Sequence, residues 1–203
     1  MTQYLDSRGH GLTTSSAAAA DAFNAGMHGF VCWRTDTMDH LDAAMAADPD
    51  FALPKLAKGW ILQTARSAAF HPLINDLLAD AAPLMEAASG REQAYFHGLT
   101  AAVGGHGVAA ATVMEAMLAD HPTDLLGHRL VQFELFWNGR AAWMREMVER
   151  AAPAWNKDLV DHGCFLSARS FANEEAGDYE LAERCGRQAV EIDPTDCWGT
   201  HAV

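Results

Sequence analysis

Three segments of the chain end in nearly the same way, and this repetition constrains the fold more than any other feature. They are LDAAMAADPDF, VMEAMLADHPTD and GRQAVEIDPTD, at residues 41–51, 113–124 and 186–196. Their prolines, Pro49, Pro122 and Pro194, lie 73 and 72 residues apart. Self-similarity at a fixed spacing is typical of proteins built from repeated units that stack on one another. The chain is therefore expected to be a repeat protein.

Half of this spacing is close to the period of about 34 residues that defines a tetratricopeptide repeat, a unit of two antiparallel helices. Gly105 and Gly177 each lie 17 residues before a proline, where a turn between two helices is needed. Ala182 and Ala189 are small enough to let neighbouring helices approach. Pro194 ends the last helix, because proline cannot continue the hydrogen-bond ladder. We predict three clear repeats and two divergent ones between them.

The intervening segments also have helical patterns. Residues 51–70 carry apolar side chains at helical spacing. Pro72 is expected in the first turn of the next helix, Pro83 at a kink and Gly90 at a C-terminal stop. Two further signals concern other segments: a helix cap at Ser15 or Ser16, and a turn at Asn138–Gly139.

The predicted fold class is therefore all-α. We expect a right-handed α-solenoid of about five tetratricopeptide-like helix-turn-helix pairs, in a single domain over residues 1–203. The repeats are predicted at 15–49, 51–90, 91–122, 124–156 and 162–194, and 195–203 would begin an incomplete repeat.

The segment TDCWGTHAV is expected to form a short helix docked on the helix pair at 162–192 through Trp198 and Val203. Trp198 occupies a position where a large residue normally packs between the two helices of its own repeat. A helix this short leaves part of the apolar face uncovered, and exposed apolar surface favours association. The expected form is a homodimer through this end of the solenoid.

The composition argues against several classes of function. The chain has 14 Lys and Arg against 27 Asp and Glu, a net charge of −13, which argues against nucleic-acid or anionic-membrane binding. We see no membrane-spanning stretch and no signal peptide. The four cysteines are widely spaced and form no CxxC, so we interpret them as reduced thiols in a cytoplasmic protein.

Several segments are more specific than the general repeat pattern: LTTSSAAAADAFNAG, AADPDFALPKLAKG, REQAYFHGL, LADHPTDLLGHRL and IDPTDCWGTHAV. Together, and in this order, they resemble the N-terminal part of the tetratricopeptide repeat protein 38 family. The resemblance implies an all-helical, largely cytoplasmic repeat protein and supplies no catalytic residues. It also implies that the sequence is part of a longer protein.

Ten histidines invite a catalytic or metal hypothesis, but no HExxH motif and no pair of histidines at i, i+4 occurs. Five histidines fall on predicted first helices and could converge in space; we interpret them as separate: His28, His97, His128, His162 and His201. Cys164 lies two residues from His162, and residues at that spacing do not face one another on a helix. No phosphate-binding or dinucleotide motif is present. We therefore predict no catalytic residues, no metal and no cofactor.

Aromatic and acidic residues suggest a binding surface instead. Phe136, Trp137 and Trp143 could form one wall of a groove on the concave face. Phe171, Glu174 and Glu175 could form an acidic lip suited to a basic or amphipathic peptide. The other concave-face candidates are His97, His128 and His201. The predicted function is a scaffold that binds a protein or peptide. The alternative is a small-ligand-binding protein or an enzyme, with a pocket on the concave face lined by histidines and aromatics.

Overall fold

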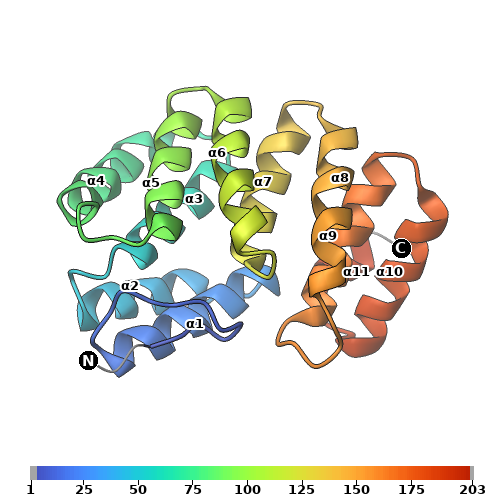
Figure 1. Cartoon of the computed structure of the whole chain (residues 1–203), viewed down its shortest axis with the longest axis horizontal. Helices are drawn as coiled ribbons and strands as arrows, with labels where there is room; N and C mark the ends of the chain where they lie inside the picture. The colour runs from blue at the N-terminus through green and yellow to red at the C-terminus, as the bar shows by residue number, and fades with distance from the viewer. Residues whose placement is uncertain (1–3, 202–203) are drawn as a thin grey trace.

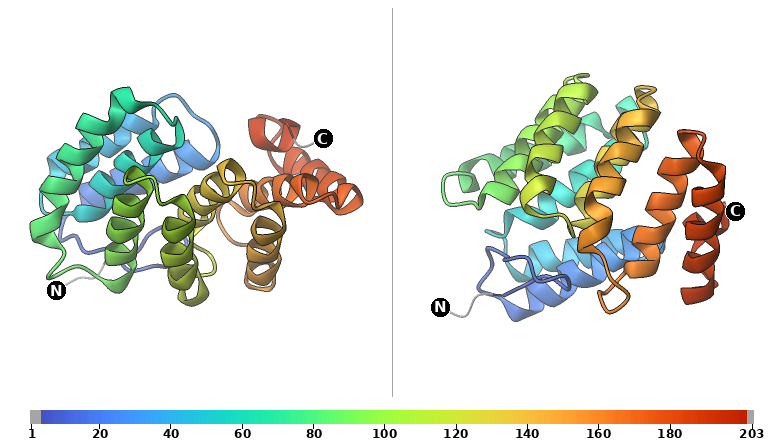
Figure 2. Two further views of the ribbon diagram at one scale, coloured as in Figure 1. Left: turned by 90° about the horizontal axis from the view of Figure 1, so that it is seen from above. Right: turned by 45° about the vertical axis from the view of Figure 1, so that its right-hand side comes forward.

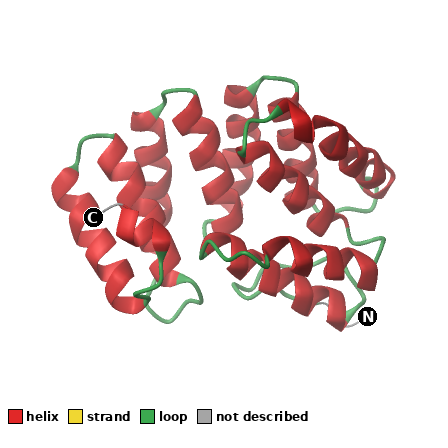
Figure 3. Cartoon of the chain, turned by 180° about the vertical axis from the view of Figure 1, so that it is seen from behind, coloured by secondary structure: helices red, strands yellow, loops and turns green. Residues whose placement is uncertain are grey.

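The computed structural model describes residues 4–201, and the regular structure within them is helical (Figure 3). The α-helices are α1 (Ala17–Val31), α2 (Thr37–Ala47), α3 (Ala52–Thr64), α4 (His71–Ala81), α5 (Gly90–Val103), α6 (Gly107–Asp120), α7 (Leu125–Trp137), α8 (Ala141–Ala151), α9 (His162–Glu175), α10 (Tyr179–Ile192) and α11 (Cys197–His201). Short 3-10 turns follow α3, α4 and α8. The prediction of an all-helical chain is confirmed.

Successive helices form hairpins that follow one another across the molecule, from blue to red in Figure 1. α1 packs on α2, α3 on α4, α5 on α6, α7 on α8 and α9 on α10. Seen from above, the row of hairpins curves (Figure 2). Because of this curvature α7 also contacts α1 and α3, which lie three and two hairpins earlier in the chain. No helix in the described part of the chain is both long and apolar enough to cross a bilayer.

The predicted turns between paired helices at Gly105, Gly139 and Gly177 are confirmed. Gly105, Gly139 and Gly177 have φ angles of +81°, +64° and +86°, a left-handed conformation that glycine adopts without steric cost. At Gly177 the flanking amide of Asp178 donates to a carbonyl five residues earlier, which is the Schellman arrangement that ends a helix. Pro122 lies just beyond the end of α6, and Pro194 just beyond the end of α10.

Three other local signals have mixed outcomes. Ser16 caps α1 by accepting a hydrogen bond from the amide of Ala19, and Pro72 lies in the first turn of α4, as predicted. Pro83 does not kink a helix: α4 ends at Ala81, and the proline lies in the following 3-10 turn.

The prediction that Gly90 stops a helix is also wrong, because it is the first residue of α5. Ser89 accepts a hydrogen bond from the amide of Glu92, whose side chain accepts one from the Ser89 amide. This reciprocal capping box starts a helix. The sequence SGRE at residues 89–92 therefore indicates the start of a helix.

Close packing between hairpins depends on small side chains. A Cβ added to Gly98 of α5 would lie 2.9 Å from both the Trp60 ring and the Met114 side chain, closer than real Cβ contacts. Ala182 and Ala189 on α10 are fully buried, as expected for residues at a helix interface. The helices therefore approach closely only because these positions carry little or no side chain.

The segment before α1 lies across the starts of α5 and α7 and is held there by buried charges. The Arg91 guanidinium donates to Asp6 at 2.9 Å and to Asp124 at 2.7 Å, and the Tyr95 hydroxyl donates to Asp124 at 2.8 Å. Burial alone would raise the pKa of Asp124, but the Arg91 charge and hydrogen bonds from Arg91 and the Gly127 amide hold it below its usual range. The carboxylate is therefore ionised in the native state.

The last described helix, α11, packs on α9 and α10, which confirms the predicted docking of this segment. Gly199 is buried against Ala189. Val203, the other residue expected to dock, lies outside the described residues.

Candidate functional site

A set of aromatic side chains gathers where α1, α7, α9 and α11 meet, and we call it the aromatic strip. Its members are Trp33, Phe133, Phe136, Trp137, Phe171, Trp198 and His201. Contacting rings have centroids 4.6–6.3 Å apart, mostly in edge-on or tilted arrangements that aromatic pairs favour. The strip therefore joins side chains from the first hairpin to those from the last.

Trp198 is the centre of one half of the strip. Its ring contacts Trp33 at 4.6 Å and Phe133 at 5.7 Å between centroids. The Arg129 guanidinium carbon lies 4.9 Å from the Trp198 ring centroid, a cation–π distance. Trp198 was predicted to pack between the helices of its own repeat. Instead it bridges α11 to α7 and to the end of α1.

Arg129 is fully buried beneath Trp198 and is held by three acceptors. It donates to Gln132 Oε1 at 3.2 Å, to the Ser167 hydroxyl at 2.9 Å and to the Cys164 carbonyl at 3.2 Å. Burial lowers the pKa of Arg129 to about 10, which leaves it charged at neutral pH. The charged, buried Arg129 guanidinium therefore packs against the Trp198 ring.

The other half of the strip contains four of the predicted binding residues. Phe136 contacts Trp137 at 5.2 Å and Phe171 at 5.5 Å, and Phe171 contacts His201 at 6.3 Å. Trp137 is 57% exposed, although an indole ring is normally among the most buried side chains. This half brings together residues of α7, α9 and α11.

Trp33 is equally exposed, at 55%, and its backbone is unusual. It follows the C-cap of α1 with φ +58°, at the position where helices usually end in glycine. A non-glycine residue held in this conformation costs free energy, and such strain is concentrated at functional sites. Trp33 is thus a large, half-exposed aromatic residue at a backbone position that favours glycine.

A surface pocket of about 250 Å³ opens beside Trp33, between the end of α1 and α3. Its lining is mainly apolar and hydroxyl-bearing: Phe30, Trp33, Arg34, Thr35, Thr37, Met38, Ile61 and Thr64. A pocket of this size and composition can accept one apolar side chain.

The acidic lip lies on the same helix as Phe171. Glu174 and Glu175 follow it by three and four residues, which places them on the same face of α9. Glu174 is half-buried and Glu175 is exposed.

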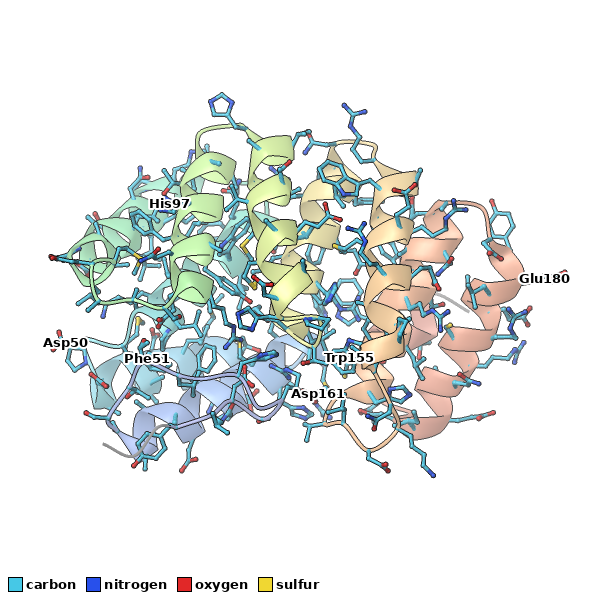
Figure 4. All side chains as sticks on the ribbon, in the orientation of Figure 1. Asp50, Phe51, His97, Trp155, Asp161 and Glu180 are labelled. Atoms are coloured by element: carbon cyan, nitrogen blue, oxygen red, sulfur yellow. The ribbon has the colours of Figure 1, made fainter. Side chains whose placement is uncertain are left out.

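Three of the predicted histidine and aromatic residues do not belong to the strip. Trp143, predicted as part of the aromatic wall, instead donates from Nε1 to Glu115 at 2.7 Å. His128 is buried on the other side of α7, where Nε2 lies 3.0 Å from the Pro122 carbonyl oxygen, so its predicted place on an accessible concave face is wrong. His97 lies on α5 beside Phe96, far from α9 and α11 (Figure 4). The five histidines have different neighbours and do not form a common cluster in the described structure.

Sequence reasoning did not assign Trp33, Phe133 and Trp198 to the binding surface. Phe133 could have been found, because it precedes Phe136 by one helical turn. Trp33 could not, since it comes from a hairpin far from α7 in the sequence.

No model of a known protein family matches the chain, and no solved structure matches its fold.

Proposed function

We propose that the chain is a right-handed α-solenoid of tetratricopeptide-like repeats, related to the tetratricopeptide repeat protein 38 family, and that it binds a protein or peptide segment. The repeat assignment is supported by five successive hairpins, of which three turn at a glycine, and by prolines just beyond α6 and α10. The proposed role is that of a scaffold.

The observation that carries the binding role is the pair of exposed tryptophans on the aromatic strip. Trp33 and Trp137 are both more than half exposed, yet each contacts a ring that is itself packed into the fold. Rigid, partly exposed aromatic residues are enriched among those that dominate protein interfaces, because they bury much area at a small entropic cost.

The charge of the surface indicates the chemistry of the partner. The chain is strongly acidic, and Glu174 and Glu175 lie next to Phe171. The expected partner is a segment with an aromatic or large aliphatic anchor and neighbouring Lys or Arg residues. Complementary charge speeds association and selects partners more than it adds affinity.

The test is selection from a phage-displayed library of random peptides, followed by calorimetric titration of the enriched peptides. Recovered peptides should combine an apolar anchor with basic residues. Trp33→Ala or Trp137→Ala should weaken binding roughly 30-fold, which corresponds to the loss of about 2 kcal/mol expected at a hot spot.

The matched control is Tyr179→Ala, which removes an aromatic residue that is 69% exposed on α10, away from the strip. It should leave the affinity unchanged. Failure to recover any binder, or equal affinity of both tryptophan variants and wild type, would contradict the proposal.

The pocket beside Trp33 gives little support to the small-ligand or enzyme alternative, whereas two pockets elsewhere have a histidine and a carboxylate in their lining: His128 with Glu115, and His121 with Asp120. The pocket beside Trp33 is apolar and hydroxyl-bearing, and its lining includes no histidine or carboxylate among the described residues. Binding of an anchor side chain accounts for it more directly than acid–base chemistry does.

A further inference from the structure

Four side chains with metal-binding atoms meet where the end of α1 approaches the start of α9, and we call them the donor cluster. They are His28 and Cys32 from α1, and Asp161 and Cys164 from the start of α9. Figure 4 labels Asp161, which lies in the loop leading into α9, beside the end of α1. The two halves of the cluster are more than 120 residues apart in the sequence.

Three of the donor atoms are close enough to share one ion, and Cys164 Sγ adjoins one of them. His28 Nδ1 lies 2.7 Å from Asp161 Oδ1 and 3.6 Å from Cys32 Sγ, and these three atoms all lie within 4.8 Å of one another. Cys164 Sγ lies 2.9 Å from Cys32 Sγ. Bond lengths of zinc to nitrogen, oxygen and sulfur place tetrahedral ligands about 3.3–3.8 Å apart. Shifts of less than about 1 Å bring the two shortest contacts into this range, and Cys164 Sγ, which lies outside the group of three, would also turn toward the ion on binding.

Local structure orients each half of the cluster. His28 and Cys32 are four residues apart in the last turn of α1, so their side chains lie on one face of the helix. Asp161 directly precedes α9 with φ +62°, a strained conformation for a residue other than glycine. Cys164 follows in the first turn of α9.

A buried arginine fixes the carboxylate. Arg8 Nη1 donates to Asp161 Oδ2 at 2.6 Å, and the two side chains are 1% and 2% exposed. The second oxygen, Oδ1, is thereby directed toward His28. Outer partners that orient a ligand in this way are a regular feature of metal sites.

We propose that His28, Cys32, Asp161 and Cys164 bind one zinc ion. Two thiolates, an imidazole nitrogen and a carboxylate oxygen form a donor set that zinc prefers, and four protein ligands are typical of a structural site. Binding displaces one proton from each thiol, and also the imidazole proton wherever His28 is protonated. The three anionic ligands and the ion leave one negative charge, which the Arg8 guanidinium balances.

Such an ion would link the first hairpin to the fifth. His28 is 55% exposed, so the site has an entry route from solvent, whereas Cys32 and Cys164 are buried. The ion would hold the end of α1, and with it Trp33, against α9. Zinc is therefore expected to stabilise the curvature that assembles the aromatic strip.

The test uses the chain after chelation and reduction of its cysteines. Zinc added in competition with a chromophoric chelator should bind with a stoichiometry of one per chain and raise the melting temperature. Cobalt should give the absorption bands of a tetrahedral thiolate site. His28→Ala and Cys32→Ser should each weaken zinc binding by more than the roughly 10–100-fold cost of losing an outer-shell partner.

Two variants serve as matched controls: Cys185→Ser removes a buried cysteine on α10, and His162→Ala removes the histidine that follows Asp161. Both should bind zinc as wild type does. Because His28 is half exposed, its alanine variant is expected to fold, which circular dichroism checks.

Absence of saturable binding by the reduced chain would overturn the proposal, as would unchanged affinity of folded His28→Ala. If peptide mapping finds a Cys32–Cys164 disulfide and the reduced chain binds no zinc, the cluster is a thiol–disulfide pair instead.

Discussion

Replacing His128 by glutamine should flatten the dependence of the chain's stability on pH. The imidazole is fully buried on α7, and Nε2 must carry the hydrogen because the Pro122 carbonyl at 3.0 Å can only accept one. Nδ1 is buried and has no hydrogen-bond partner among the described residues. Protonation would therefore place an N–H and a full charge in an unpaired, buried position.

The shift in the pKa sets the size of the effect. Burial lowers the pKa of His128 from 6.5 to about 4, against smaller opposing effects of the Pro122 carbonyl and the Asp124 charge. Between these two values the unfolded chain binds a proton that the native chain does not, so stability falls as the pH falls from about 6.5 to 4. The loss from this residue is about 2 kcal/mol at pH 5 and about 3 kcal/mol at pH 4.

The assay is urea denaturation followed by circular dichroism at pH 7, 6 and 5, for wild type and His128→Gln. The glutamine amide can still donate to Pro122 but does not titrate. The difference in unfolding free energy between the two proteins should therefore shift by about 2 kcal/mol, in favour of the variant, between pH 7 and pH 5. A difference that stays constant over this range would refute the buried, neutral imidazole.

Two further predictions concern packing and the buried charges. Gly98→Ala should destabilise the fold by about 1–3 kcal/mol in thermal or urea unfolding, because the new methyl group would overlap Met114. Gly90→Ala should not, because nothing lies within 4 Å of the added Cβ. Equal effects of the two substitutions would contradict the packing argument. Asp124→Asn should lower the free energy of unfolding by about 3 kcal/mol, because Arg91 loses one of its two buried carboxylate partners. A free energy of unfolding within about 0.5 kcal/mol of wild type would show that Asp6 alone neutralises the guanidinium.

Local backbone chemistry explains what could be predicted from the sequence. The turns at Gly105 and Gly177, the cap at Ser16 and the helix stops near the repeat prolines depend on a few consecutive residues. The two errors about helix boundaries, at Pro83 and Gly90, also have local causes. Pro83 follows the end of α4 and does not kink it, and Gly90 starts α5 and does not end the preceding helix.

The candidate sites could be predicted only in part, because their members come from different hairpins. Phe136 and Trp137 were predicted for one wall of a groove and Phe171 for a separate lip, and the structure brings the three rings into contact. Nothing near Trp33 in the sequence indicates that it meets Trp198. The spacing of His28 and Cys32, one turn apart, was a usable signal, whereas a search for histidine pairs alone overlooked it.

The sequence by itself determined the helices, their pairing and the order of the hairpins, because turns, caps and apolar periodicity act over one or two helices. Only the tertiary structure decided that the row of hairpins curves until α1 meets α7 and α9. That curvature results from small packing rotations added over several hairpins, each set by contacts such as those of Gly98, Trp60 and Met114. No single segment determines the total curvature. The residues of the aromatic strip and of the donor cluster therefore come together only in the folded chain.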